Sequence, residues 1–355
     1  MMLHVKKSVV GSLEKCYALA ELRYRGREHF LCASEQAKPC YLISPDGVIE
    51  ETVWEGPGGV MTMRQIPGTD GQFLATRKFY SPDASKEASI VVVTPKGKND
   101  WEMRTLVDLP FVHRFDILER GGRHYLIACA LKSGHEFPGD WRFPGRVFAA
   151  ELPADFSVFD DAHQLELTVL KEGLTKNHGY CRHAEDDGTS SIVSADNGVF
   201  QFRPPETAGG AWEIETLTTD AASDALLLDL NGDGAEELCA IAPFHGDTIR
   251  VYERKGGKFE IAYEHPERLK FLHAIFGGEI AGRNTWVLGS RQDDMRLLAF
   301  TYENGKYEAQ ELDRGCGAAN VLHFVRGGKD IIAAANRETD EIALYELTRV
   351  IRKHG

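Results

Sequence analysis

The sequence predicts an all-β chain that forms a seven-bladed β-propeller, closed by an N-terminal strand that completes the last blade. A unit of strand, turn, strand, loop and strand recurs about seven times, at a spacing of roughly 45 to 65 residues that is typical of propeller blades. The strands are rich in Val, Ile, Leu, Phe and Tyr and lie between Gly and Asp turns. No window carries the apolar stripe at i, i+3 and i+4 that an amphipathic helix requires.

The unit at 221–254 shows the pattern most clearly. Two apolar runs, 225–229 and 238–242, flank a tight turn, and a third run at 248–252 follows a polar loop. Three strands in a meander cannot hide their apolar faces from water, so neighbouring copies must complete the core. The other copies are predicted at 15–44, 59–94, 111–153, 177–202, 271–302 and 318–347.

The two ends of the chain predict how the ring closes. The last unit ends near Thr348, after its third strand, and residues 3–10 form a strand that belongs to no unit. Pairing of 3–10 with 342–347 would complete the last blade and remove exposed strand edges. No Pro-rich or Ser-rich linker separates the units, so residues 1–355 are predicted to form a single propeller domain.

Composition argues against several classes of function. With 355 residues, 43% of them hydrophobic, the chain can bury a large core. Its formal net charge of −13 argues against a nucleic-acid partner, because phosphate binding requires a clustered cationic face. No apolar run has the length of a membrane span, and the N-terminus lacks the apolar core of a secretion signal. Seven scattered cysteines without CxxC spacing indicate reduced thiols, so a cytoplasmic location is predicted.

The turn in the clearest unit carries a set of oxygen ligands. Four oxygen-bearing side chains surround the bend at Gly234, as the binding of a hard cation such as calcium requires. They are Asp229, Asn231, Asp233 and Glu237. Asp and Asn also cap tight turns by accepting backbone hydrogen bonds. The sequence leaves both interpretations open: a structural calcium ion, or a turn that these residues cap alone.

Histidines recur at equivalent positions of the predicted blades. Such positions face one another around one mouth of the central channel. Three of the histidines open first strands and the fourth lies between a second and a third strand: His113, His178, His273 and His245. Neutral imidazole is a ligand for zinc, manganese, nickel and iron, so these four residues are predicted to hold a divalent transition metal ion. The alternative is that each is a hydrogen-bonded core histidine.

Other polar residues are predicted to serve chemistry at the same mouth. Tyr180 and Lys132 are candidates for proton transfer, provided that their surroundings shift each pKa toward neutrality. Arg77, Arg291 and Arg337 are predicted to clamp an anionic group of the substrate. For each arginine the alternative is an ordinary ion pair with one of the abundant carboxylates.

A long loop at 133–146, SGHEFPGDWRFPGR, interrupts the unit at 111–153. It joins the second and third strands, so it is predicted to lie over the same mouth. Carbohydrate pockets use aromatic rings and carboxylates, and His135, Asp140 and Trp141 are therefore predicted to contact a substrate. The alternative is that the prolines and glycines of this loop form a rigid cover.

Two groups of residues resemble known families: the turn at 229–238, and the histidines together with the long loop. The segment DLNGDGAEEL at 229–238 resembles the FG-GAP or VCBS-type repeat, whose turn often holds calcium in integrin-like propellers. The histidines at the blade starts, with Asp140-Trp141 and Pro144-Gly145 in the insertion, are similar to the propeller domain of aldos-2-ulose dehydratase and related sugar lyases. The resemblance implies a propeller fold and elimination chemistry on a sugar.

Two classes of function follow. The first is a metal-dependent lyase or dehydratase that performs β-elimination on a small keto-sugar, glycoside or uronic-acid derivative in the central funnel. Its metal would polarise a carbonyl or carboxylate oxygen and stabilise the enolate that forms. The alternative is a non-catalytic FG-GAP or VCBS-type propeller that binds a protein partner or ligand. The sequence contains no GxSxG elbow, no P-loop and no GxGxxG after a strand.

Overall fold

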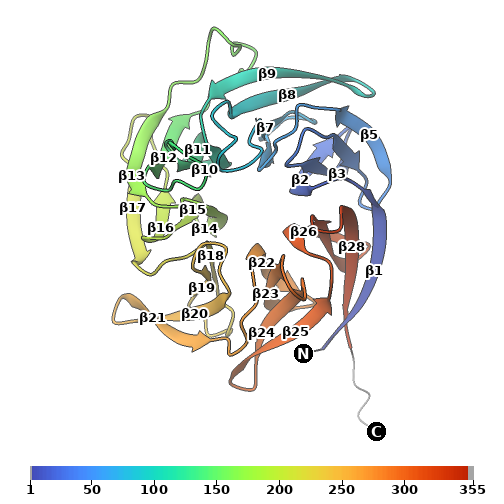
Figure 1. Ribbon diagram of the computed structural model, residues 1–355, viewed down its shortest axis with the longest axis vertical. Helices are drawn as coiled ribbons and strands as arrows, with labels where there is room; N and C mark the ends of the chain where they lie inside the picture. Colours follow the sequence, from blue (N-terminus) through green and yellow to red (C-terminus); the bar gives the residue numbers. More distant parts are fainter. Residues whose placement is uncertain (1, 351–355) are drawn as a thin grey trace.

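The computed structural model describes residues 2–350 as an all-β protein, and no helix occurs in that part of the chain. No segment there is therefore a helix long and apolar enough to cross a membrane. Every paired strand is antiparallel to its neighbour, and the strands form five sheets of four strands and one of eight. The sheets lie in a ring around a common centre (Figure 1).

Four of the four-stranded sheets run in sequence order from their first strand to their last. They are β2 (Cys16–Tyr24), β3 (Arg27–Ser34), β4 (Cys40–Ile43) and β5 (Ile49–Trp54); β6 (Met63–Gln65), β7 (Phe73–Arg77), β8 (Ser89–Gly97) and β9 (Asp100–Asp108); β18 (Asp224–Leu228), β19 (Glu237–Ala242), β20 (Thr248–Lys255) and β21 (Lys258–Glu264); and β22 (Leu272–Ile280), β23 (Arg283–Ser290), β24 (Leu297–Glu303) and β25 (Lys306–Asp313).

The eight-stranded sheet consists of two halves that each repeat this order. The first half holds β10 (Val112–Arg120), β11 (Arg123–Lys132), β12 (Pro144–Glu151) and β13 (Thr168–Leu174), and the second holds β14 (Gly179–Glu185), β15 (Gly188–Ala195), β16 (Gly198–Arg203) and β17 (Glu213–Thr218). A single residue pair, Arg120 with Gly188, joins β10 to β15. The sheet curves along one side of the ring (Figure 1).

The remaining sheet joins the two ends of the chain. It contains β26 (Ala318–Arg326), β27 (Lys329–Asn336), β28 (Glu341–Arg349) and β1 (Leu3–Ser12), in the order β1-β28-β27-β26. The register pairs Leu3 with Arg349 and Val9 with Ala343. The predicted pairing of 3–10 with 342–347 is thus confirmed. The pairing covers the edge of β28, which would otherwise be exposed, and β1 becomes the outer strand of the sheet.

The outer strands are the elements that the sequence units omitted. Each unit named three strands, whereas the sheets add a fourth on the outside of the ring, such as β17, β21 and β25 (Figure 1). In β21 five of seven residues are exposed, and its sequence is KFEIAYE. An outer strand packs on one face at most, so it lacks the continuous apolar run that marks the inner strands.

Four of the innermost strands share a one-residue irregularity. The register shifts by one residue in β2, β10, β22 and β26, at Tyr17, His113, His273 and Ala319 respectively. The residue two positions earlier has a positive φ in every case: Lys15 (51°), Phe111 (63°), Phe271 (57°) and Gly317 (61°). A bulge bends its strand and re-aims one side chain. The same local device therefore sets the direction of two histidines and a tyrosine.

The core lies between neighbouring sheets of the ring. Trp286 and Phe300 from one sheet pack with Ile241, Ile249 and Val251 from the next, and all five are fully buried. Large aromatic side chains contribute most of the apolar area in such an interface. This packing holds the inner strands close to the axis and so positions the residues that face it.

Candidate functional site

The four predicted histidine ligands meet at one mouth of the ring. Nε2 of His178 lies 3.3 Å from Nε2 of His245, and potential ligand atoms of these two and of His273 all lie within 4.8 Å of one another. The ring centroid of His113 is 4.6 Å from that of His178. Within residues 2–350, the three-histidine set is the one group whose geometry suits a metal ion. The four imidazoles line a cavity of about 310 Å³.

Hydrogen bonds at Nδ1 orient three of the imidazole rings. Nδ1 of His113 donates to the carbonyl of His178 (3.2 Å), and Nδ1 of His273 donates to the carbonyl of Ala319 (2.6 Å). Nδ1 of His178 has both the Ser223 carbonyl (3.2 Å) and Asp224 Oδ2 (3.1 Å) within reach. With Nδ1 protonated, Nε2 of each neutral ring carries a free lone pair. This is the arrangement by which proteins orient metal-binding histidines.

Acceptors outnumber donors among these side chains. The Tyr17 hydroxyl lies 3.0 Å from Nε2 of His273 and 3.4 Å from Nε2 of His113, but it has one proton to donate. His245 can give at most one further proton to Nε2 of His178. The remaining lone pairs face a buried space, where an unmatched acceptor is costly. A cation satisfies such a donor set, so these residues fit a divalent transition metal ion.

The protonation of the imidazoles agrees with this role. Burial lowers the pKa of His113 and of His273 well below the ordinary value, and neighbouring imidazoles and arginines lower it further. Burial, with the charges of His178 and Arg291, lowers the pKa of His245 to about 2. Neutral rings can coordinate a metal without first losing a proton.

Two of the three predicted arginine clamps lie at this cavity. Arg291 and Arg337 line it, and both bond to Glu338: Nε of Arg291 at 2.9 Å and Nη1 of Arg337 at 2.8 Å. Arg337 also bonds to Glu35. Arg77 instead donates to Ser89 and Thr105 and does not line the cavity. The first two arginines are therefore ion-paired and also available at the mouth.

Aromatic rings form the wall beside the histidines. Phe244 stacks on His245 with ring centroids 3.9 Å apart, and Phe271 stacks on its other side at 4.2 Å. Trp141 contacts Phe244 at 5.3 Å, so the 133–146 loop reaches the site through that ring. Phe244 and Phe271 line the cavity, whereas Trp141 does not.

The other predicted residues of the loop support its shape. Asp140 is buried and accepts hydrogen bonds from the guanidinium of Arg142 and from two backbone amides, of Glu136 and Arg142. These bonds, chiefly those from the Arg142 side chain, hold the pKa of Asp140 below its ordinary value. His135 packs edge-on against Phe111, at 5.8 Å. The geometry of these two residues favours the rigid-cover interpretation over direct substrate contact.

The two predicted proton-transfer residues lie away from the imidazoles. Nζ of Lys132 is bonded to Asp83 at 2.5 Å and faces the Trp141 ring at 4.9 Å, beneath the loop. Tyr180 donates to Asp116 at 3.2 Å and lines a different cavity. Burial raises the pKa of Tyr180 well above its ordinary value, which opposes a role as a base. The structure does not bring either residue to the histidines.

The sequence predictions assigned no chemical role to Tyr17 or Glu35. Both line the cavity, and Tyr17 touches two of the four imidazoles. The signal was present, because Tyr17 opens the first strand of its unit just as His113 and His273 open theirs.

The carboxylate turn at 229–237 has a different geometry. Asp229 accepts hydrogen bonds from the amides of Gly232, Asp233 and Gly234. Glu237 accepts from the amides of Leu230 and Asn231 and from the Asn231 side chain, Nδ2 to Oε1 at 2.6 Å. Burial raises the pKa of Glu237 to about 7. These bonds favour the capped-turn interpretation, and calcium binding here stays a prediction.

No protein-family model matches the chain, and no curated protein matches it. Among solved structures it is similar to the extracellular domain of a putative one component system from B. thetaiotaomicron, with a TM-score of 0.56 and 11% sequence identity. The match covers 98% of this chain and 40% of that chain, so this chain spans less than half the length of its neighbour. At this identity the likeness concerns the fold alone, and it is consistent with a β-rich, propeller-like architecture.

The predicted cytoplasmic location does not stand, because this neighbour with the same fold is an extracellular domain. The prediction rested mainly on free cysteines. Six of the seven are buried and the other, Cys181, is partly buried. Buried thiols behave as small apolar side chains, so they carry little information about the redox state outside.

Proposed function

We propose that the chain is a single-domain, seven-bladed propeller of the FG-GAP or VCBS type, in which the eight-stranded sheet represents two blades. The central funnel holds a divalent transition metal ion on His178, His245 and His273, with His113 beside them. The protein is a metal-dependent lyase that performs β-elimination on a small keto-sugar, glycoside or uronic-acid derivative. The observation that carries this proposal is the convergence of Nε2 atoms whose rings are oriented through Nδ1.

The elimination needs no external oxidant or reductant. A base removes the proton beside the substrate carbonyl, the electron pair forms a carbon–carbon double bond, and the carbon–oxygen bond to the leaving group breaks. A bound metal ion acts as a Lewis acid on the carbonyl or carboxylate oxygen of the substrate. The protein must then supply a proton acceptor, a proton donor for the leaving oxygen, and groups that hold the sugar.

Residues of the cavity match these tasks. Burial raises the pKa of Tyr17, so its hydroxyl keeps its proton at neutral pH and can donate it to the leaving oxygen. Glu35 is the one carboxylate that lines the cavity among residues 2–350, and we assign it as the proton acceptor. Arg291 would orient an anionic substrate group, while Phe244 and Phe271 offer ring faces to a sugar.

Metal analysis of the purified protein tests the proposal. We expect about one transition metal ion per chain, lost when His178 and His273 are both changed to Ala. The metal-loaded wild-type protein should convert an oxidised glycoside or a uronate to a product with a new conjugated carbonyl, which absorbs in the ultraviolet. Bound calcium alone, or no metal together with no product from either substrate class, would favour the non-catalytic propeller that binds a partner or ligand.

A further inference from the structure

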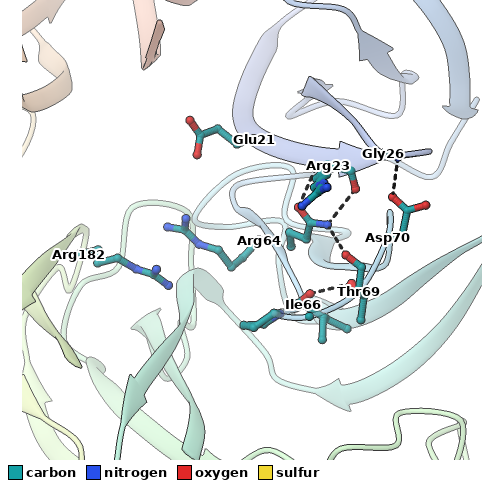
Figure 2. Close-up of a pocket in the computed structure, with 11 residues that line it drawn as sticks. Glu21, Arg23, Gly26, Arg64, Ile66, Thr69, Asp70 and Arg182 are labelled. Carbon is teal, nitrogen blue, oxygen red and sulfur yellow. Dashed lines mark hydrogen bonds between the residues drawn. The ribbon is translucent and has the colours of Figure 1, made fainter. Parts of the chain in front are cut away.

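A second polar site lies in the central channel, away from the histidines. Its centre is Asp116 on β10, which is fully buried although it carries a carboxylate. Arg64 on β6 and Arg182 on β14 approach it from two different sheets, and Figure 2 shows both arginines extending into one pocket. None of these three residues lines the histidine cavity.

One carboxylate is shared by two guanidinium groups. Oδ1 of Asp116 lies 2.6 Å from Nε of Arg64 and 2.7 Å from Nη2 of Arg182. Oδ2 lies 3.1 Å from Nη2 of Arg64 and 3.0 Å from Nε of Arg182, and Tyr180 also donates to it. Burial by itself raises the pKa of Asp116, but the two arginines outweigh it and hold the pKa below its ordinary value. The cluster of one anion and two cations keeps a net positive charge.

The arginines retain unused hydrogen-bond donors. Among residues 2–350, no hydrogen bond uses Nη1 of Arg64 or Nη1 of Arg182. Both side chains are about one-third exposed, at 37% and 34%. Asp116 accepts hydrogen bonds from Nε and Nη2 of Arg182 and from Nη2 of Arg64. These bonds hold both guanidinium groups and leave Nη1 of each open.

Space for a ligand adjoins these open nitrogens. Cavities of about 560 Å³ and about 400 Å³ share Arg64, Arg182 and Glu21 in their linings, so they are contiguous. Arg23 lines the first, and Arg114, whose buried Nε has no hydrogen-bond partner, lines the second. Glu21 is the one further carboxylate among the lining residues that the two cavities share, and burial raises its pKa.

We propose that this pocket binds a small oxyanion, a carboxylate or phosphate group, between Arg64 and Arg182. Arginine presents paired N–H donors that match the oxygens of either group. Asp116 is a positioning residue: it holds the guanidinium groups in place before the ligand arrives, which reduces the ordering cost of binding. The chain as a whole has a net charge of −13 and so repels anions at long range. The positive charge of this pocket would attract an anionic ligand at short range.

Titration calorimetry of the full chain tests this site, with inorganic phosphate and acetate as separate probes at constant ionic strength. We expect saturable binding of at least one probe. The probe that binds more tightly indicates whether the ligand of this pocket carries a phosphate or a carboxylate group. Arg64→Gln and Arg182→Gln should each weaken binding at least tenfold, on the order expected for the loss of one charge-assisted contact. Circular dichroism and the melting temperature in chloride check that each variant is folded.

Two further variants keep the outcome unambiguous. Arg104 is exposed to the same extent as Arg64 (39%) but lies outside both cavities, so Arg104→Gln should bind the probe as the wild type does. His178→Ala should also leave anion binding unchanged, which separates this site from the proposed metal centre. No saturable binding by either probe, or equal binding by a folded Arg64→Gln variant, would overturn the proposal. If Arg182→Gln does not fold, the Arg64→Gln variant decides the test.

Discussion

The histidine cluster and the turn at 229–237 both have the residue types of a metal site, yet they differ in what those residues already bind. At the cluster, hydrogen bonds occupy Nδ1 of three rings and leave each Nε2 facing the cavity. At the turn, the carboxylate oxygens of Asp229 and Glu237 accept bonds from amides of the same turn. The first arrangement leaves its Nε2 atoms with fewer protons than they can accept, whereas the second matches its carboxylate oxygens with amide donors.

The comparison teaches that unsatisfied acceptors, more than residue types, define a candidate cation site. A buried lone pair without a donor costs free energy, and a metal ion recovers it. An oxygen that already accepts two or three amide hydrogen bonds gains less from a cation, because some of those bonds must break or weaken. Each of the following experiments tests one side of this contrast.

The largest effect is expected for loss of a histidine ligand. We expect His178→Ala and His273→Ala each to weaken transition-metal binding by about a hundredfold or more, since even the loss of a residue that only orients a ligand costs about 10- to 100-fold. Metal content after dialysis, with a titration against a competing chelator, measures this. His163, whose side chain is 76% exposed, provides the control: His163→Ala should keep full metal content. Wild-type affinity in His178→Ala would contradict the metal centre.

A smaller loss is expected at the carboxylate behind His178. Asp224 Oδ2 lies 3.1 Å from Nδ1, and both side chains are almost fully buried. Asp224→Asn keeps the shape but removes the charge that supports the imidazole, so metal affinity should fall by about 10- to 100-fold. The same chelator titration measures it. If the affinity does not change, the Ser223 carbonyl alone orients the ring.

The two regions should respond to pH with opposite sign. The pKa of His245 falls from 6.5 to about 2 on folding, so the unfolded chain binds the extra proton between these values and stability decreases as the pH drops below 6.5. The pKa of Glu237 rises from 4.5 to about 7, so the folded chain binds the extra proton and stability decreases as the pH rises through that interval.

Melting temperatures measured in steps between about pH 4 and pH 8 test this contrast. We expect His245→Gln to reduce the loss of stability on the acid side, and Glu237→Gln to reduce the loss as the pH rises. Profiles that run parallel to the wild type in both variants would show that neither group titrates as its burial requires.

The smallest effect is expected at the turn. Asp229→Ala removes the acceptor for three backbone amides and should destabilise the protein by about 1–2 kcal/mol, as the loss of a helix or turn cap does. Urea unfolding measures this. Millimolar calcium should shift the melting temperature of the wild type by less than about 1 °C if the amides hold these carboxylates. A larger shift that Asp229→Ala abolishes would restore the calcium interpretation.

The fold was largely predictable because its signal is local. Apolar alternation and turn residues follow from the chain itself, and they located the inner three strands of each recurring unit and the pairing of the two ends. The outer strands escaped because partial exposure removes that alternation, as in β21. The repeat register also predicted that the four histidines lie close together, since equivalent positions of a repeat face one axis.

The depth of a residue along the axis was not predictable in this way. Tyr180 on β14 lies two residues beyond His178, which directly precedes that strand. Two residues of extended chain span roughly 6 to 7 Å, and at that depth Tyr180 donates to Asp116. Arg64, Asp116 and Arg182 come from three strands and gave no motif at all.

The amino-acid order by itself determined which segments become the inner strands, because apolar alternation acts within one short segment, and the repeat spacing indicated which imidazoles share a mouth. Tertiary structure alone decided the direction and the partner of each polar side chain. A one-residue bulge at Tyr17, His113 and His273 reverses which face a side chain takes. The partners that orient the imidazoles, such as the carbonyls of His178 and Ala319, come from other strands, which no local pattern contains.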